Sequence, residues 1–314
     1  MEKFAQLFKK VNGLEKLKQY ARAHVLFFSL FQTVLNGFSK KSLEIVRLSV
    51  NNKVLNKLRK KYKKFISNYV NDHQNDILEH KHSNKVWVCW MQGIENAPSL
   101  VQKCYQSLQE NFKDKDIILL TEENYREYVT FPTHIQDKID KGIITKTHFS
   151  DLLRLELLIN QGGTWIDATV YCSGNCPEYM FNSDLYVFQN LKPGLDGAAT
   201  RISSWFMSSF TNHPILLLSR ELLYEYWNKN NEMIDYFLLH DFIELAIEAY
   251  PNEWKKVIPF SNSTPHILLL RLFDEYDENI WNATKEMTSI HKLTYKFDIN
   301  KIREKGTYYD KIFN

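Results

Sequence analysis

Two carboxylates and one arginine near the middle of the chain have the types and spacing of a site for a ligand rich in hydroxyl and phosphate groups. Asp151 and Arg154 lie three residues apart in a stretch with helical periodicity, so their side chains share one helix face. Asp167 follows a short apolar stretch with the pattern of a strand. Carboxylates accept hydrogen bonds from hydroxyls or hold a divalent cation, and a guanidinium group neutralises phosphate. A structural interpretation is also open, in which Asp151 only favours the helix start and pairs with Arg154.

Motifs for several other chemistries do not occur in the sequence. It has no P-loop, no glycine-rich dinucleotide fingerprint after the first strand, no nucleophile elbow and no H-E-x-x-H zinc motif. Four cysteines are too few for a disulfide framework in a chain of 314 residues. Cys172 and Cys176 have no second pair of cysteines to complete a zinc site. We therefore expect reduced thiols in a cytoplasmic protein.

The surrounding elements have the pattern of an α/β fold with a parallel sheet. Strands and helices alternate after a polar linker. The helix that carries the arginine is expected to begin at Ser150 and to end at Gly162 or Gly163. Its start, with Asp151, and the strand end, with Asp167, are expected to meet at the sheet edge where ligands of open α/β sheets bind. The expected strands are 85–90, 116–120, 164–167 and 185–190, and the expected helices are 97–112, 149–163, 213–227 and 232–250.

The first part of the chain is basic and differs from the rest. Residues 1–64 contain 16 lysines and arginines but only 3 acidic residues, whereas the remainder of the chain is acidic. Amphipathic periodicity predicts a basic helical N-terminal region, residues 1–80, followed by a catalytic domain, residues 85–314. Two interpretations of the first region are open: a helical hairpin that packs on the main domain, or helices that lie on an anionic membrane surface. We do not expect nucleic-acid binding, because no recognised nucleic-acid module accompanies the charge.

One stretch, residues 146–172 (KTHFSDLLRLELLINQGGTWIDATVYC), resembles the nucleotide-sugar region of DXD-type glycosyltransferases. It is most similar to the bacterial capsular polysaccharide synthesis proteins, which are related to glycosyltransferase family 32. Weaker similarity extends the match to residues 85–296, through the segments 86–112, 203–216 and 291–296. The resemblance implies a GT-A-like, Rossmann-type sheet flanked by helices, here with the mainly helical basic extension at its N-terminus. It also implies a nucleotide-sugar donor, UDP- or GDP-linked, and Mn²⁺ or Mg²⁺ as cofactor.

The resemblance assigns roles to the central residues by position. Asp151 contacts the nucleotide or sugar, and Arg154 contacts the sugar or a phosphate. Asp167 takes the first place of the D-x-D motif, near the ribose or the metal, but the third place is Thr169. A hydroxyl is a poorer ligand for a hard cation than a carboxylate. Either Asp167 alone supplies the direct carboxylate ligand, with Thr169 and His291 as further candidates, or metal dependence is weak.

A W-x-Q-G motif contributes to the expected nucleotide site. Trp90, Gln92 and Gly93 lie at the exit of the first strand, and tryptophan stacks well on bases and sugar faces. Trp87, three residues earlier, faces the opposite side of the strand and is expected in the core. Gly163, in the G-G pair of the central motif, is also expected at the donor.

The C-terminal motif HKLTYK supplies the remaining expected site residues. The resemblance places His291 at the diphosphate or metal, and Lys292 and Lys296 where they stabilise the leaving diphosphate. Each of the three also has a structural interpretation, as a buried histidine or as solvated lysines.

These observations predict a glycosyltransferase that acts in capsular or surface polysaccharide synthesis. The resemblance implies a hexosyltransferase-type enzyme that retains configuration; an inverting enzyme needs a base, for which Asp235, Asp241 and Glu244 are candidates by type. The expected acceptor is a lipid-linked oligosaccharide, bound by a protein that is peripheral on the inner face of the cell membrane. The first 20 residues lack a signal-peptide core, and the apolar stretch 24–38 is too short to span a bilayer. The alternative is a catalytically degenerate nucleotide-sugar-binding scaffold, which Thr169 permits.

Overall fold

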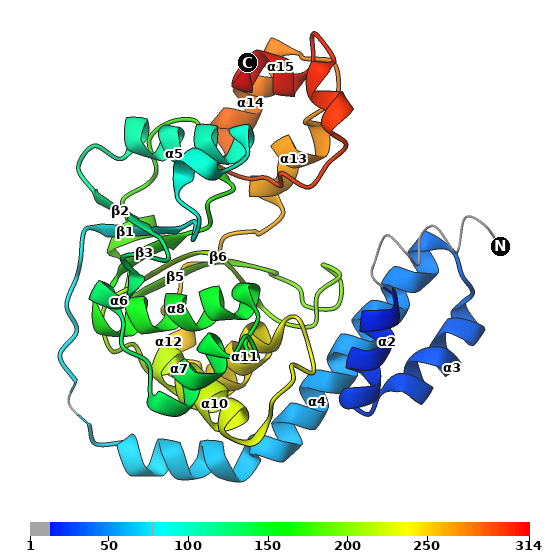
Figure 1. The fold of residues 1–314 in the computed structure, drawn as a ribbon, viewed down its shortest axis with the longest axis vertical. Helices are drawn as coiled ribbons and strands as arrows, with labels where there is room; N and C mark the ends of the chain where they lie inside the picture. Colours follow the sequence, from blue (N-terminus) through cyan, green and yellow to red (C-terminus); the bar gives the residue numbers. More distant parts are fainter. Residues whose placement is uncertain (1–12, 77) are drawn as a thin grey trace.

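The computed structural model describes residues 13–76 and 78–314 as an α/β domain with helical additions at both ends (Figure 1). A central sheet lies between two layers of helices, and the long helix α4 runs beneath one layer. The expected strands at 85–90, 116–120 and 185–190 are present within one residue at each end, so the local pattern was sufficient there. The strands are β1 (Lys85–Cys89), β2 (Asp116–Leu120), β3 (Gly163–Ile166), β4 (Val170–Cys172), β5 (Leu185–Gln189), β6 (Ile202–Ser209) and β7 (Ile290–Lys292). The helices include α2 (Gly13–Arg22), α3 (Leu26–Asn36), α4 (Lys40–His73), α5 (Ser99–Asn111), α6 (Tyr125–Tyr128), α7 (Thr133–Asp140), α8 (Lys146–Asn160), α9 (Tyr179–Asn182), α10 (Pro214–Lys229), α11 (Leu238–Ala249), α12 (Pro251–Trp254), α13 (Ile267–Arg271), α14 (Glu278–Met287) and α15 (Tyr308–Phe313).

The main sheet has the strand order β2-β1-β3-β6-β5. β1 pairs in parallel with β2 and β3, whereas β6 is antiparallel to both of its neighbours. Four strands therefore run in one direction and β6 runs in the other. Trp87 of β1 pairs with Trp165 of β3, and both rings are buried on the same face. The expected Rossmann-type α/β sheet flanked by helices is confirmed.

Helix α8 begins earlier than the sequence pattern predicted. The cap is Thr145, whose hydroxyl accepts a hydrogen bond from the backbone N–H of His148, and not Ser150. Asp151 therefore lies in the second turn of the helix and not at its first residue. The expected end of the helix is confirmed, because Gly162 has φ of +66°, a left-handed conformation that glycine adopts readily.

Two apolar clusters hold the sheet between its helices. One cluster joins the face that carries Trp87 and Trp165 to helices α8, α10 and α11. The other joins the opposite face to α5. A third cluster packs α13 and α15 at the C-terminal end, on the same side as α5 (Figure 1). Because both faces of the sheet are buried, most residues of its strands are apolar and do not alternate with polar ones.

The N-terminal helices are attached through α4. Val50, Val54, Leu58 and Tyr62 form a stripe on this helix, and all four are buried in the same cluster as α10 and α11. The ring of Tyr62 meets that of Phe242 edge-on at 5.1 Å. Helices α2 and α3 pack beyond the end of this contact, away from the sheet (Figure 1). Within residues 13–76 and 78–314, no helix is both long and apolar enough to cross a membrane.

A second, two-stranded sheet brings the C-terminal motif to the main α/β domain. β7 pairs antiparallel with β4, and Val170 lies opposite Lys292. Two residues separate Asp167 from the start of β4. The pairing of β4 with β7 therefore sets the C-terminal segment beside the end of β3. The chain reaches this position after 120 residues, which explains why local pattern did not predict the pairing.

Candidate active site

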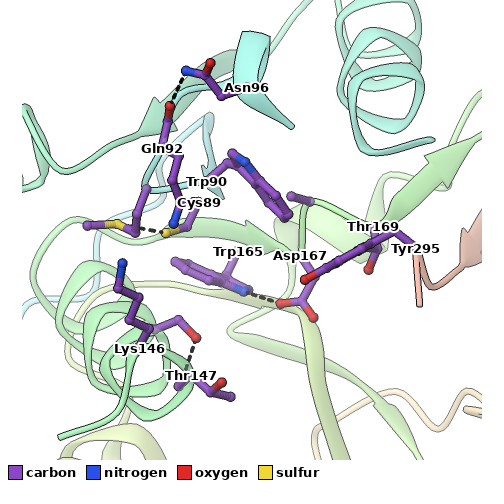
Figure 2. Close-up of a pocket in the computed structure, with 13 residues that line it drawn as sticks. Cys89, Trp90, Gln92, Asn96, Lys146, Thr147, Trp165, Asp167, Thr169 and Tyr295 are labelled. Carbon is purple, nitrogen blue, oxygen red and sulfur yellow. Dashed lines mark hydrogen bonds between the residues drawn. The ribbon is translucent and has the colours of Figure 1, made fainter. Parts of the chain in front are cut away.

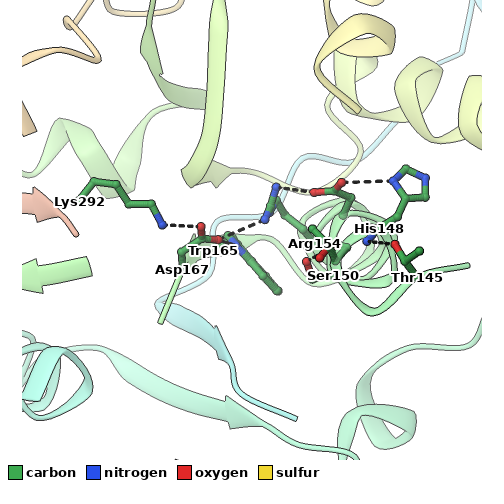
Figure 3. A network of polar contacts seen from close by, with 9 residues as sticks. Thr145, His148, Ser150, Arg154, Trp165, Asp167 and Lys292 are labelled. Atoms are coloured by element: carbon green, nitrogen blue, oxygen red, sulfur yellow. Dashed lines mark hydrogen bonds and ion pairs between the residues drawn. The ribbon is translucent and has the colours of Figure 1, made fainter. Parts of the chain in front are cut away.

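Asp151, Arg154 and Asp167 meet in one ion-pair network (Figure 3). Arg154 donates from Nη1 to Asp151 Oδ1 at 3.1 Å and from Nη2 to Asp167 Oδ1 at 3.2 Å. The guanidinium group is only 4% exposed, and a buried cation requires such partners. The helix face and the strand end therefore converge, as their positions in the sequence predicted.

Lys292 enters the same network from β7. Its Nζ donates to Asp167 Oδ2 at 2.8 Å and to Thr169 Oγ1 at 2.7 Å. Both polar positions of the D-A-T motif are thus bonded to one ammonium group. Burial opposes ionisation of Asp167, but Lys292 and Arg154 outweigh it and lower the pKa of this carboxyl. Asp167 is therefore held as an anion between two cations.

Trp165 fixes the orientation of both charged partners. Its Nε1 donates to Asp167 Oδ1 at 3.0 Å, and the guanidinium carbon of Arg154 lies 4.8 Å from the ring centre (Figure 3). The sequence contained a signal for this contact, because residues two apart on a strand point to the same side. Trp165 was nevertheless not among the predicted site residues.

His148 is a further residue that the motif analysis missed. Its Nδ1 lies 3.3 Å from Asp151 Oδ2, one helical turn away, and the residue is almost fully buried. Asp151 is therefore held between His148 and Arg154, which fixes the carboxylate on the face that looks toward Asp167.

A cavity of about 510 Å³ opens beside this network, at the carboxyl ends of β1 and β3 (Figure 2). Trp90 and Tyr295 form one part of its wall, with their rings edge to face at 5.6 Å. Asp167 and Trp165 lie at another part of the lining. Ligand sites of open α/β sheets occur at this edge, and the volume is typical of a small-molecule site. The lining comprises Cys89, Trp90, Met91, Gln92, Asn96, Lys146, Thr147, Ser150, Trp165, Asp167, Ala168, Thr169 and Tyr295.

The cavity contains four of the residues expected from the sequence: Trp90, Gln92, Asp167 and Thr169. Three more are connected to the lining: Arg154 and Lys292 through their ion pairs with Asp167, and Asp151 through its ion pair with Arg154. Trp87 is buried in the core, as expected, and donates from Nε1 to the carbonyl of Gly162 at 2.9 Å.

The remaining expected residues do not line the cavity. Gly93 shapes the loop after β1 with φ of +81°, and its N–H bonds the carbonyl of Trp90. Gly163 brings β3 close to β1. Lys296 is exposed, with its Nζ 6.0 Å from the ring centre of Tyr295.

His291 lies on the other face of β7 from Lys292. Its Nε2 is 2.8 Å from Ser173 Oγ, and the residue is fully buried. Burial lowers the pKa of His291 to about 3, so the imidazole is neutral at physiological pH. His291 is therefore a buried histidine held through Nε2 by Ser173, and its Nδ1 has no hydrogen-bond partner among the described residues.

The residues at this edge fit a divalent cation poorly. Asp167 and Thr169, two of the expected ligands, both accept hydrogen bonds from Lys292, and His291 points to Ser173. In the part of the chain that the structure describes, no three His, Cys, Asp or Glu side chains are grouped to hold a metal ion. Hard cations require several oxygen ligands, and here a lysine already supplies positive charge between the two.

The fold and the site together define an α/β protein with a charged ligand cavity at the carboxyl ends of its strands. The chain belongs to the capsular polysaccharide synthesis protein family, whose sequence model matches residues 36–312. Seven chains among the solved structures are similar, including one titled PaToxG Glycosyltransferase. That structure has 12% sequence identity and a TM-score of 0.39, and the alignment covers 82% of this chain and 95% of that one. The comparison with curated proteins finds no match.

Proposed function

We propose that this protein is a glycosyltransferase of capsular polysaccharide synthesis, which transfers a hexose from a nucleotide-sugar to an oligosaccharide acceptor. The observation that carries the proposal is the network of Asp151, Arg154, Asp167 and Lys292 beside a cavity at the strand ends. Such a cavity can hold a nucleotide on its aromatic wall and a diphosphate near its cations. Membership of the capsular polysaccharide synthesis protein family supports this assignment.

In the proposed reaction, an acceptor hydroxyl oxygen forms a bond to the anomeric carbon on the face from which the diphosphate leaves, the bond from that carbon to the diphosphate oxygen breaks, and the hydroxyl proton passes to the leaving diphosphate. Negative charge develops on the leaving diphosphate, so the protein accelerates the step chiefly by positioning and by charge stabilisation. Lys292 and Arg154 are the cations closest to Asp167, and both are held in place before any ligand binds. Because the family that the chain resembles mostly retains configuration, we expect a retained anomeric configuration.

We assign the base of the nucleotide to the aromatic side of the cavity. Trp90 and Tyr295 offer ring faces, and Gln92 and Asn96 offer amide groups for the base edge. Asp167 then lies toward the ribose and diphosphate.

We further propose that the acceptor is lipid-linked and that helix α3 holds the enzyme on the inner face of the cell membrane. Phe27, Phe31, Val34 and Leu35 lie on one side of α3, at the spacing of a helix face. All four are exposed, Phe27 by 88%. An apolar stripe this exposed is unusual for a surface helix that contacts only water.

The charges next to this stripe favour an anionic bilayer as its partner. Lys40, Lys41 and Lys53 are exposed near α3, and Lys53 lies 5.5 Å from the ring centre of Phe28. None of the three forms an ion pair with an acid among the described residues. A helix that combines apolar side chains with nearby lysines binds at an anionic membrane interface.

A thermal-shift screen of UDP- and GDP-sugars, with and without Mn²⁺, tests the catalytic proposal. A selective shift names the donor nucleotide, and turnover of that donor with crude membrane acceptor establishes transfer. The control is Asp167→Ala, which we expect to abolish turnover. Donor binding without turnover in the wild-type protein would favour the scaffold alternative instead.

A further inference from the structure

A second cavity of about 240 Å³ lies between the N-terminal helix α4 and the catalytic domain. Arg47 and Asn51 line it from α4, and Asp235 and Asp241 line it from the start of α11 and the segment before it. The loop after β5, including Ala199, forms another side. The cavity is separate from the nucleotide cavity described above, because the two have no lining residue in common.

Asp241 is the unusual group in this cavity. It is only 2% exposed, and its Oδ2 is buried without a hydrogen-bond partner among the described residues. Glu244, one turn further along α11, shows the ordinary arrangement: its two oxygens accept from the backbone N–H of Arg201 at 2.8 Å and meet the Arg201 side chain at 3.1 Å. Buried polar atoms are nearly always paired, so the unpaired oxygen of Asp241 points to a partner that the polypeptide does not supply.

His240 offers a second unpaired atom on the same lining. Its Nδ1 is buried without a partner in the described part of the chain. Burial lowers the pKa of His240 to about 4, so the ring is neutral. The charges of Asp151, Arg154 and Asp167 also act on the pKa of this ring.

The chemistry of the lining favours a neutral, hydroxyl-rich ligand. Its acids are Asp235, Asp241 and Asp196, whereas the guanidinium group of Arg47 is paired with Glu44 at 2.8 Å. Carboxylates, amides and an imidazole exchange hydrogen bonds with hydroxyls, and ionised carboxylates repel phosphate. The volume is below the ~300–1,000 Å³ of sites for drug-sized ligands, a size that suits one sugar ring.

We propose that the second cavity binds a single neutral sugar ring, whose hydroxyls bond to Asp241 and His240. The proposal deepens the glycosyltransferase assignment and rests on it for the identity of the ring. Two sources offer this chemistry: the sugar of the bound donor and the terminal sugar of the acceptor. In either case α4 forms part of the substrate site and is more than a membrane attachment.

Asp241→Asn tests the proposal, because it keeps the shape of the side chain and removes the acid. Burial raises the pKa of Asp241 well above its usual value, with Asp235 and Glu244 adding to the effect and Arg59 opposing it. An acid with a raised pKa in the folded state costs stability once the pH exceeds the unfolded pKa of about 3.9. We therefore expect Asp241→Asn to raise the melting temperature at pH 7–8 and to have no such effect near pH 3.

The same variant is expected to bind sugars more weakly. Binding is measured by thermal shift and calorimetry on the full chain, with UDP, GDP, their sugar conjugates, and free glucose, galactose, mannose and N-acetylglucosamine as probes. We expect about 10- to 100-fold weaker binding of the sugar, with binding of UDP or GDP unchanged. If Asp241→Asn weakens the binding of nucleotide-sugars alone, the ring in the second cavity is the sugar of the donor. If it weakens the binding of free sugars alone, the ring is the terminal sugar of the acceptor. A gain in stability together with a loss of sugar binding marks a functional group and not a packing group.

Two further variants complete the test. Ala199→Leu fills the cavity from the loop without changing the acid, and we expect it to weaken sugar binding in the same way. Glu244→Gln, outside the lining, is the matched control and should leave sugar binding unchanged. The proposal is overturned if no probe sugar binds the wild-type protein, or if Asp241→Asn and Ala199→Leu both bind every probe as the wild-type protein does. If UDP and GDP fail to bind the wild-type protein while free sugars bind and respond to Asp241→Asn, the glycosyltransferase assignment fails and the sugar site stands.

Discussion

Lys292 Nζ lies 2.8 Å from Asp167 Oδ2. Lys292 belongs to β7, far along the chain, and it holds the acid that directly follows β3. The same ammonium group bonds Thr169, the residue that replaces the second acid of the D-x-D pattern. We propose that Lys292 supplies positive charge at the position where the resemblance implies a metal, so that a second carboxylate ligand is not required.

The first prediction concerns this charge. We expect donor turnover to persist in EDTA and to change little on addition of Mn²⁺. Lys292→Met, which keeps the chain length and removes the charge, is expected to lower kcat by about 10²–10³-fold, the usual effect of removing one stabilising group. Measurement of kcat in metal-depleted buffer checks both statements.

An exposed lysine of the same motif provides the control. Lys296→Met alters a side chain that does not reach Asp167, so a change of less than about threefold is expected. If EDTA abolishes turnover and Mn²⁺ restores it, Lys292 does not replace the cation and the expectation of a Mn²⁺ or Mg²⁺ cofactor is correct.

A second prediction follows from the burial of Arg154. Arg154→Met leaves Asp151 with only His148 and removes one of the two cations that hold Asp167. Breaking a buried ion pair in this way costs roughly 3–5 kcal/mol of unfolding free energy. Urea denaturation measures the loss, and the double variant Asp151→Asn, Arg154→Met should recover part of it.

An exposed pair elsewhere on the molecule sets the scale for that measurement. Arg126 and Asp140 lie 3.3 Å apart with both side chains more than half exposed. Arg126→Met is expected to cost less than about 1 kcal/mol, because solvent screens exposed pairs. An equal loss for the two arginine variants would show that the network around Arg154 is not the stabilising unit described here.

The pH dependence of Asp167 gives a third prediction. The folded-state pKa of this acid is lowered, so its ion pairs stabilise the fold above the unfolded pKa of about 3.9 and cease to do so as the pH falls through the folded pKa. The unfolding free energy of Asp167→Asn should therefore lie below that of the wild-type protein at pH 7, with the gap closing below about pH 4. If the difference in unfolding free energy between the two proteins stays constant from pH 7 to pH 3, Asp167 does not carry the charge assigned to it.

Local patterns in the sequence were enough to predict four of the five strands of the main sheet and the convergence of Asp151 and Asp167, but not the antiparallel strand β6. They depended on short-range features: the apolar strands, the i, i+3 spacing and the glycines after α8. The bond from Lys292 to Thr169 depends on the pairing of β4 with β7 across 120 residues, which one sequence does not encode in any local period. The earlier start of α8 had a different cause, because Thr145 and Ser150 are both residue types that cap helices and the better type by rank, serine, is not the one used.

A fourth prediction concerns the close approach of β3 and β1 at Gly163. A Cβ added there would lie 2.3 Å from the backbone carbonyl oxygen of Lys85, and φ is +92°. Gly163→Ala should therefore shift β3, lower the unfolding free energy and disturb Asp167 at the end of the strand. Gly142→Ala is the matched control, since Gly142 has φ of +68° but nothing within 4 Å of an added Cβ. Its cost should be only the ~1–2 kcal/mol of the left-handed conformation, and similar melting temperatures for the two variants would contradict the steric argument.

The last prediction separates membrane attachment from catalysis. The double variant Phe27→Asp, Phe31→Asp places two negative charges on the apolar stripe of α3, a helix that contributes no lining residue to either cavity. We expect the variant to lose co-sedimentation with phosphatidylglycerol vesicles while it keeps its shift with the donor nucleotide.

The wild-type protein should bind phosphatidylglycerol vesicles less tightly as salt rises and phosphatidylcholine vesicles only weakly, because the lysines near α3 contribute electrostatic attraction. Leu195→Asp is the control, since Leu195 is 83% exposed but lies on the loop after β5. This control should sediment like the wild-type protein.

If α3 instead contacts a second copy of the chain, the α3 double variant will change the oligomeric state in vesicle-free buffer, and that result would refute a membrane role for the stripe. An apolar stripe flanked by lysines that form no ion pair with any described residue is matched better by an anionic lipid surface than by its own like-charged copy, so we expect binding to the vesicles.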